Sequence, residues 1–367
     1  MSLAPPHISA ISPYVPGKPM TELERELGLT STIKLASNES PLGPSAKVLR
    51  ALRAQLGAIN RYPDGSAYEL TRALAGKLDV PPESLLLGNG SNEVIDIAVR
   101  TFLRPGEEVV SAKGAFVVYQ LATQAAGGTN VVVPMREHTH DLPAMAAAVT
   151  SRTRMVFVAN PNNPTGTWVP ERAVERFLAA LPAGVIAVFD EAYHEYVARR
   201  NFPDTLSRVR AGLPVFCLRT FSKAYGLAGL RLGYLVGPPE YVAEMNKVRE
   251  PFNTNHLAQV AALAALGDER HLGRVVRLNR RERARLAGEL QSLGLDVIPS
   301  EANFLLAGVR RDGNALYQEL LRRGVIVRPV GNYGYPRHLR ITVGLPEEND
   351  RLIAALREAL AAVPAVE

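Results

Sequence analysis

One lysine of this 367-residue chain lies between a hydroxyl group and an arginine, in a stretch with few other charges. Lys223 follows Ser222 directly, and Arg231 comes shortly afterwards, behind two glycines. The apolar run 215–218 precedes this stretch and predicts a strand. An amine at a strand end, beside phosphate-binding groups, is what an enzyme needs to hold pyridoxal 5'-phosphate (PLP) as a Schiff base. The spacing therefore indicates a cofactor lysine at a buried rim, whereas an isolated Ser-Lys pair would indicate a solvated surface charge.

A glycine turn earlier in the chain offers a place for a phosphate. The apolar residues 85–87 lead into a turn that ends at Gly90, and Ser91 and Asn92 then open a predicted helix over 91–103. Free backbone N–H groups at a helix start, together with the Ser91 hydroxyl, can bind an anion. A plain turn with Ser91 as the helix N-cap is the simpler alternative.

A second polar junction follows the apolar run 155–159. Two prolines and a glycine in the loop 160–166 restrict its backbone, so the amide of Asn163 can be held in one direction. An amide in that place can hydrogen-bond the phenolic oxygen of a pyridoxal ring. A rigid turn without a binding role remains the alternative.

A third junction places a carboxylate directly after a strand. Asp190 follows the apolar residues 185–189, and Tyr193 comes three positions later. A buried carboxylate is costly unless it is paired, and a protonated pyridine nitrogen is a suitable partner that keeps the ring an electron sink. Tyr193 could reach the same ring oxygen as Asn163. The alternative for Asp190 is a helix N-cap or a structural ion pair.

The elements that must position these residues alternate along the chain. Short β-branched runs at 84–87, 108–111, 155–159, 185–189 and 215–218 are interspersed with helical patterns such as 91–103 and 117–126. Strands that are apolar on both faces are typical of a parallel sheet covered by helices. Such a doubly wound sheet brings the carboxyl ends of its strands to one crevice. The sequence thus predicts an α/β fold in which the polar junctions meet.

The pattern changes after residue 234. Long helices are predicted over about 254–294, followed by short strands at 295–298, 303–306, 325–328 and 339–342. This order is typical of a smaller α+β domain. We expect an N-terminal arm at 1–31, a large domain with a mostly parallel sheet at 32–249, and a small domain at 250–367.

Composition excludes several other classes of protein. No run reaches the roughly 20 apolar residues of a membrane span, and residues 1–20 hold five prolines and lack the apolar core of a signal peptide, so we expect a cytoplasmic protein. The single cysteine, Cys217, excludes an intrachain disulfide and lies in an apolar run, which predicts a buried, inert thiol. No metal site is expected.

The net charge of +6 permits binding of nucleic acid, but the basic residues are mostly dispersed. The densest cluster, at 274–285, alternates with leucine and valine at helical spacing, which predicts the solvated face of a long amphipathic helix. A non-catalytic basic binding module remains the alternative outside the enzymes. It would be colourless, whereas a PLP enzyme is yellow and is bleached by borohydride.

The ordered set of phosphate turn, Asn, Asp with Tyr, Lys and Arg resembles the fold-type-I PLP-dependent aminotransferases. The similarity covers nearly the whole chain and is greatest to the histidinol-phosphate aminotransferase family. Its motifs are matched at 12–18, 35–44, 61–65, 160–166, 190–193, 222–231, 299–304 and 339–344.

This resemblance implies a role for each matched residue. Lys223 would carry the cofactor and move the proton, Asp190 would hold the ring nitrogen, and Asn163 and Tyr193 would hold the ring hydroxyl. The residues implied for the phosphate are Gly90, Ser91, Asn92, Ser222 and Arg231, with Tyr62 reaching the site of the neighbouring subunit of a homodimer. Phe116 matches the aromatic residue that stacks on the ring by spacing, although 113–115 departs from the Pro-Thr pair often found there.

The substrate class that the resemblance implies depends on Tyr14, Asn163, Arg328 and Arg340. Two arginines and a tyrosine suit the phosphate of histidinol phosphate, and Arg340 would also accept the carboxylate of glutamate in the half-reaction with 2-oxoglutarate. A surface ion pair is the alternative for the arginines. The competing activities are transamination of an aromatic amino acid and PLP-dependent decarboxylation of threonine phosphate.

Overall fold

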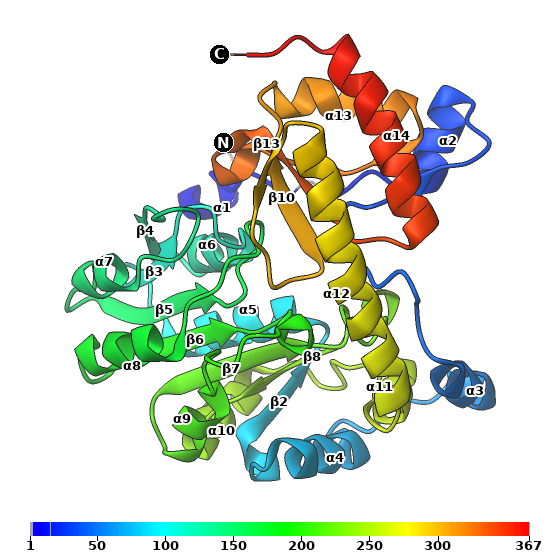
Figure 1. Ribbon diagram of the computed structural model, residues 1–367. Helices are drawn as coiled ribbons and strands as arrows, with labels where there is room; N and C mark the ends of the chain where they lie inside the picture. The colour runs from blue at the N-terminus through cyan, green and yellow to red at the C-terminus, as the bar shows by residue number, and fades with distance from the viewer. Residues whose placement is uncertain (1–2, 15, 367) are drawn as a thin grey trace.

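The computed structural model describes residues 3–14 and 16–366. Two hydrophobic cores dominate it, a large one around a central sheet and a smaller one around a second sheet. Figure 1 shows the small part above the large one, with the long helix α12 (Glu269–Ser292) running along both.

The large sheet has seven strands within the described residues, in the order β2-β8-β7-β6-β5-β3-β4. Five neighbouring strands, from β7 to β4, run parallel, and β8 runs antiparallel to both β2 and β7. The strands are β2 (Leu85–Gly88), β3 (Glu108–Ala112), β4 (Thr129–Val133), β5 (Thr153–Ala159), β6 (Ile186–Asp190), β7 (Val215–Thr220) and β8 (Gly233–Val236). β3, β6, β7 and β8 are buried along their whole length, as expected of strands that are covered on both faces.

Helices from most of the chain pack around this sheet. α5 lies against β2, β7 and β8, while α9 lies against β7 and α7 against β3. The helices of this part are α3 (Ala46–Gln55), α4 (Tyr68–Leu78), α5 (Ser91–Phe102), α6 (Val118–Ala125), α7 (Leu142–Ala147), α8 (Glu171–Ala180), α9 (Thr205–Arg210), α10 (Pro239–Val248) and α11 (His256–Leu266). The short helix α1 (Pro6–Ser9) lies against α6, where Gln124 donates a hydrogen bond to the carbonyl of His7.

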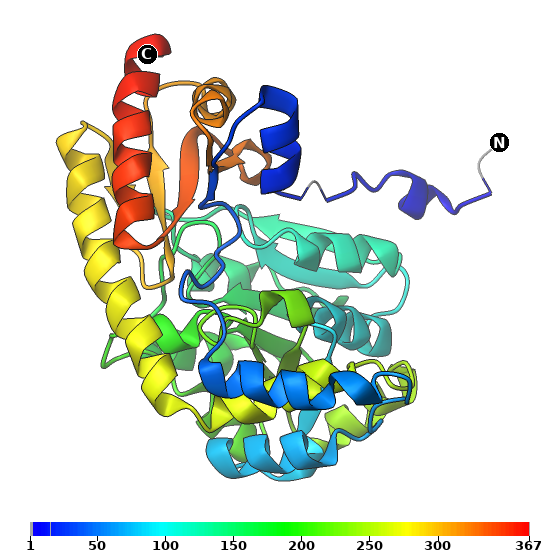
Figure 2. The same cartoon turned by 90° about the vertical axis from the view of Figure 1, so that its right-hand side faces the viewer.

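The small part is built on a four-stranded antiparallel sheet in the order β12-β13-β10-β9. Its strands are β9 (Asp296–Ile298), β10 (Phe304–Gly308), β12 (Arg328–Val330) and β13 (Tyr335–Thr342). Two further strands, β1 (Ile33–Lys34) and β11 (Val325–Ile326), pair in parallel. The helices of this part are α2 (Met20–Leu27), α12, α13 (Gly313–Arg322) and α14 (Pro346–Ala362), and Figure 2 shows α12 and α14 side by side.

The arginine-rich segment forms the predicted helix, as part of α12, and most of its arginines are exposed as expected, but two of them are partly buried in ion pairs. Arg283 has a side chain only 12% exposed and pairs with Glu301, while Arg285 pairs with Asp350 and with the buried Glu282. These pairs fix α12 to the loop before β10 and to α14. The buried thiol of Cys217 is confirmed.

The α/β class and the predicted strands of the central sheet are confirmed. The sequence analysis did not predict β4 or β8, which lie outside the runs it identified. Packing also cuts across the predicted domain limits: the buried alanines of α11 belong to the large core, and Leu35 belongs to the small one. The limits 32–249 and 250–367 therefore remain a prediction. Under these limits α11 would belong to the small domain and Leu35 to the large one, opposite to the cores on which they pack. No helix within the described residues is long and apolar enough to cross a membrane.

Candidate active site

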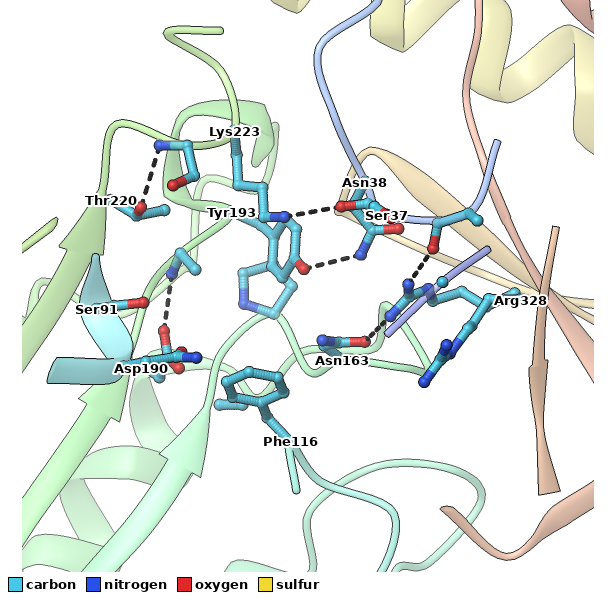
Figure 3. A pocket seen from close by; sticks show the side chains of 18 of the residues that line it. Ser37, Asn38, Ser91, Phe116, Asn163, Asp190, Tyr193, Thr220, Lys223 and Arg328 are labelled. Atoms are coloured by element: carbon cyan, nitrogen blue, oxygen red, sulfur yellow. Dashed lines mark hydrogen bonds between the residues drawn. The ribbon is translucent and has the colours of Figure 1, made fainter. Parts of the chain in front are cut away.

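A pocket lies at the carboxyl ends of β5, β6 and β7, beneath the small sheet. The structure brings most of the predicted site residues together there, although they come from eight separate segments of the chain. The predicted residues that line it are Tyr14, Ser91, Asn92, Phe116, Asn163, Asp190, Tyr193, Ser222, Lys223, Arg231, Arg328 and Arg340. Figure 3 shows that several of these side chains point toward one another across the pocket.

The amine of Lys223 reaches the segment that connects the two parts of the molecule. Its Nζ donates a hydrogen bond of 3.0 Å to the carbonyl of Ser37, as Figure 3 shows. Burial, followed by the positive charge of Arg340, lowers the pKa of Lys223 from 10.5 to about 8. About a tenth of the amine is therefore neutral and nucleophilic at pH 7, far more than for a free lysine.

The carboxylate of Asp190 ends β6 and is held on both oxygens. The Tyr119 hydroxyl donates a 2.6 Å hydrogen bond to Oδ2, and the backbone N–H of Ala192 donates to Oδ1 at 3.1 Å. Burial raises the pKa of Asp190, and these two hydrogen bonds oppose the rise. The site thus keeps a fixed acidic group that a cation in the pocket would stabilise as a carboxylate.

Two hydrogen-bond donors face the middle of the pocket. The guanidinium of Arg340 can only donate, and it donates to Oδ1 of Asn163 at 2.6 Å, so the Asn163 NH₂ group is left for the pocket. Tyr193 is 4% exposed, and burial raises the pKa of its phenol to about 12, so it stays protonated. Asn163 and Tyr193 can therefore both donate to an oxygen bound between them.

One end of the pocket is built to hold an anion. Gly90 caps the N-terminus of the twelve-residue helix α5 with φ of +80°, and a Cβ there would lie 2.4 Å from Nη2 of Arg231. Nη1 of Arg231 donates to the Ser222 hydroxyl at 3.3 Å. The helix N-terminus, the guanidinium and the hydroxyls of Ser91 and Ser222 thus meet at one place.

The other end carries two more arginines. Arg328 lies over the ring of Tyr14, 5.5 Å from its centroid, and Arg340 is 7% exposed with no hydrogen-bond partner for Nε among the described residues. Burial, opposed by Tyr193 and Tyr333, lowers the pKa of Arg340. A buried cation with a free donor favours an anionic group at this end.

Two of the predicted residues do not line the pocket. Gly90 lies directly behind Arg231, where its missing side chain leaves room for the guanidinium. Tyr62 is 82% exposed and stacks on Phe252 with ring centroids 4.7 Å apart. The Tyr62 side chain therefore lies on the surface, outside the pocket of its own chain.

The sequence analysis did not identify several residues of the pocket wall. Ser37 and Asn38 lie in the motif 35–44 but were assigned no role, and Tyr119 lies in the predicted helix 117–126, also without an assigned role. Thr220 accepts a hydrogen bond from the backbone N–H of Ser222. No local pattern distinguishes Ser37, Asn38 and Tyr119, because their partners Lys223, Tyr193 and Asp190 are distant in sequence.

Comparison with known proteins gives one consistent result. The family model "Aminotransferase class I and II" matches residues 30–356. The chain is 50% identical to the histidinol-phosphate aminotransferase of Moorella thermoacetica, covering 96% of this chain and 92% of the relative, and 51% identical to that of an Anaeromyxobacter species, covering 99% and 100%.

Solved structures agree with these relatives. The histidinol-phosphate aminotransferase of Sinorhizobium meliloti, solved in complex with pyridoxal-5'-phosphate, has a TM-score of 0.92 at 32% identity, over 99% of this chain and 98% of that one. The aspartate aminotransferase of Thermus thermophilus with maleate has a TM-score of 0.82 at 25% identity, over 98% of each chain.

Proposed function

This chain belongs to the aminotransferase class I and II family, and on that premise we propose that it transfers an amino group from histidinol phosphate to 2-oxoglutarate. The products are imidazole acetol phosphate and glutamate, a step of histidine biosynthesis. The cofactor is PLP, which supplies an electron sink for the carbon that loses its proton. The observation that carries the proposal is a pocket with an anion site at one end and two arginines at the other.

The residues of the pocket fit PLP group by group. The cradle of Gly90, Ser91, Ser222 and Arg231 suits the phosphate, and Asp190 suits a protonated pyridine nitrogen. The donors of Asn163 and Tyr193 suit the ring oxygen, and Phe116 offers an aromatic face. These assignments extend the roles that the resemblance implies, and the buried donors and acceptors described above support them.

Lys223 holds the cofactor and moves the proton. With its pKa near 8, Nζ can take the proton from the reacting carbon of the donor substrate. In the other half-reaction it can return a proton to the reacting carbon of the acceptor. Its partner in the structure, the Ser37 carbonyl, can only accept, so it orients the amine without supplying a proton.

Tyr14, Arg328 and Arg340 bind the far end of the substrate. A phosphate dianion can take forked hydrogen bonds from both guanidinium groups, and Arg340 takes the carboxylate of glutamate in the other half-reaction. One site serves both substrates in turn, as ping-pong transfer requires.

The active unit is a cytoplasmic homodimer. Large apolar side chains are exposed around α3 and the start of α11, and they include Leu49, Leu56, Ile59, Tyr62 and Phe252. A patch of this kind is typical of an interface. In such a dimer Tyr62 reaches the phosphate of the cofactor in the neighbouring subunit.

The experiment that tests the substrate compares kcat/KM for histidinol phosphate, phenylalanine and tyrosine with 2-oxoglutarate as acceptor. We expect histidinol phosphate to be preferred. A preference for an aromatic amino acid would refute the substrate and leave the transamination intact. Turnover by Lys223→Ala with unchanged visible absorbance would refute the role of the lysine.

A matched substitution separates the two anionic substrates. Arg328→Gln removes one charge-assisted fork, so we expect kcat/KM for histidinol phosphate to fall about 100-fold. The half-reaction with glutamate should fall much less, because Arg340 binds the carboxylate. Equal losses in both half-reactions would show that Arg328 does not discriminate between them.

A further inference from the structure

Asn38 connects the pocket to the small sheet. It is 1% exposed and has a left-handed backbone with φ of 56°, which asparagine tolerates better than most residues. Its Nδ2 donates a 2.9 Å hydrogen bond to the Tyr193 hydroxyl, and its backbone carbonyl accepts one from Nδ2 of Asn303. Figure 3 shows Asn38 and Tyr193 facing each other at the edge of the pocket.

The hydrogen bonds between Asn38 and Thr342 have a defined direction. The backbone N–H of Asn38 donates to Oγ1 of Thr342 at 2.9 Å. That contact uses the hydroxyl as an acceptor, so its own proton is available for Oδ1 of Asn38, 3.2 Å away. Because the Asn38 oxygen faces Thr342, the NH₂ group of the same amide must face Tyr193.

This orientation decides where the Tyr193 proton can go. An amide NH₂ group only donates, so the Tyr193 oxygen is an acceptor in its contact with Asn38. The single phenolic proton of Tyr193 is therefore left to point into the pocket. Asn163, whose oxygen is occupied by Arg340, presents its NH₂ group to the same region.

We propose that Asn38 is a positioning residue that directs the Tyr193 hydroxyl to donate into the pocket, and that Thr342 fixes the amide of Asn38 in the orientation this requires. The inference rests on the proposed function, in which Tyr193 donates to the ring oxygen of PLP. β13 carries both Thr342 and Arg340, so the strand that binds substrate also orients a donor to the cofactor.

The charged groups around Tyr193 stay the same when Thr342 is substituted. Lys223 Nζ lies 5.9 Å from the ring centroid, and Arg340 and Asp190 are the other charges that act on the phenol. A substitution that leaves these charges unchanged therefore tests the direction of the hydrogen bond.

The experiment is a pH titration of the visible absorbance of the PLP-loaded enzyme. A hydrogen bond donated to the ring oxygen stabilises its negative charge and weakens its hold on the proton shared with the Lys223 nitrogen. Thr342→Val frees the Asn38 amide to turn its oxygen toward Tyr193, so the midpoint should rise by about half a pH unit to one unit. Thr342→Ser keeps the hydroxyl and should shift the midpoint by less than about 0.2 pH unit.

Asn38→Asp gives a second, isosteric variant that tolerates the positive φ. Its carboxylate accepts the Tyr193 proton, so the midpoint should rise by about one unit or more. Thr342→Val and Asn38→Asp are then also made in a Tyr193→Phe background. This background measures any effect that does not pass through the phenol, including the added charge of the aspartate. In the Tyr193→Phe background Thr342→Val should not shift the midpoint, and Asn38→Asp should shift it less than it does when Tyr193 is present.

The outcomes are distinguishable. Shifts of equal size with and without the Tyr193 hydroxyl, or an unchanged midpoint in folded Thr342→Val enzyme, would overturn the inference while leaving the proposed function in place. A wild-type protein that develops no visible band with PLP would instead overturn the proposed function.

Discussion

Lys223 is the residue whose pH dependence is easiest to measure. Only the neutral amine attacks an aldehyde, and the pKa of about 8 places its titration well below that of a free lysine. The rate at which visible absorbance appears on adding PLP to ligand-free enzyme should therefore rise about tenfold per pH unit below 8 and level off above it. Stopped-flow absorbance measures this rate. A rise that continued to pH 10 would mean that burial does not lower the pKa of this amine.

Tyr119 offers a test of how Asp190 is held. Tyr119→Phe removes the hydrogen bond to the buried carboxylate, which should raise the pKa of Asp190 further and weaken its hold on the ring nitrogen. Because hydrogen bonds to charged groups are worth about 1.5–3 kcal/mol, the Kd for PLP should rise about tenfold or more. Tyr335→Phe is a control, since that hydroxyl contacts the sulfur of Met135. Equal Kd values for the two variants would contradict the role of Tyr119.

Single residues were predicted best where the chemistry was local. Asp190, Asn163 and Lys223 each follow an apolar strand, so their positions could be found from the sequence. Asn38 and Tyr119 could not, because their partners are Tyr193, Thr342 and Asp190, which lie far away along the chain.

At the scale of elements, the turn before α5 makes a specific prediction. Gly90→Ala would place a Cβ 2.4 Å from Nη2 of Arg231 at a φ that L-residues rarely adopt. We expect the Kd for PLP to rise at least about tenfold as the guanidinium is displaced, with a loss of about 1 kcal/mol or more in the free energy of unfolding. Titration with PLP and denaturant unfolding measure the two effects.

The matched control is a glycine inside a helix. Gly288 lies in the exposed face of α12 with nothing within 4 Å of an added Cβ. Gly288→Ala should stabilise the protein by about 0.5–1 kcal/mol and leave the Kd for PLP unchanged. If both variants lose PLP affinity equally, the close approach at Gly90 is not the cause.

The elements themselves show what periodicity can reveal. Strands apolar on both faces identified the parallel centre of the sheet, because burial on two sides imposes a composition. Their order in the sheet, and the antiparallel insertion of β8 between β2 and β7, follow from tertiary packing and leave no such composition. The predicted domain limits put helix α11 in the small domain, whereas its contacts with α3 and α4 pack it on the large core.

At the scale of the whole molecule, the exposure of Tyr62 predicts that subunits share their sites. Lys223→Ala and Tyr62→Phe enzymes are mixed, dissociated and reassociated, and activity is measured at a PLP concentration too low for the Tyr62→Phe enzyme alone. Random pairing gives about half heterodimers, each with one intact site, so the mixture should reach about a quarter of wild-type activity. If Tyr62 served its own subunit, mixing would restore nothing.

The sequence by itself determined the class of fold and the chemical groups of the site. Both depend on local rules: burial dictates strand composition, and the junctions after strands carry the reactive side chains. The tertiary structure decided which donors face the pocket and which are already used, since a hydrogen bond fixes a direction only when both partners are in place. It also placed Arg328 and Arg340 opposite the helix N-terminus, because the small sheet folds over the ends of the large one.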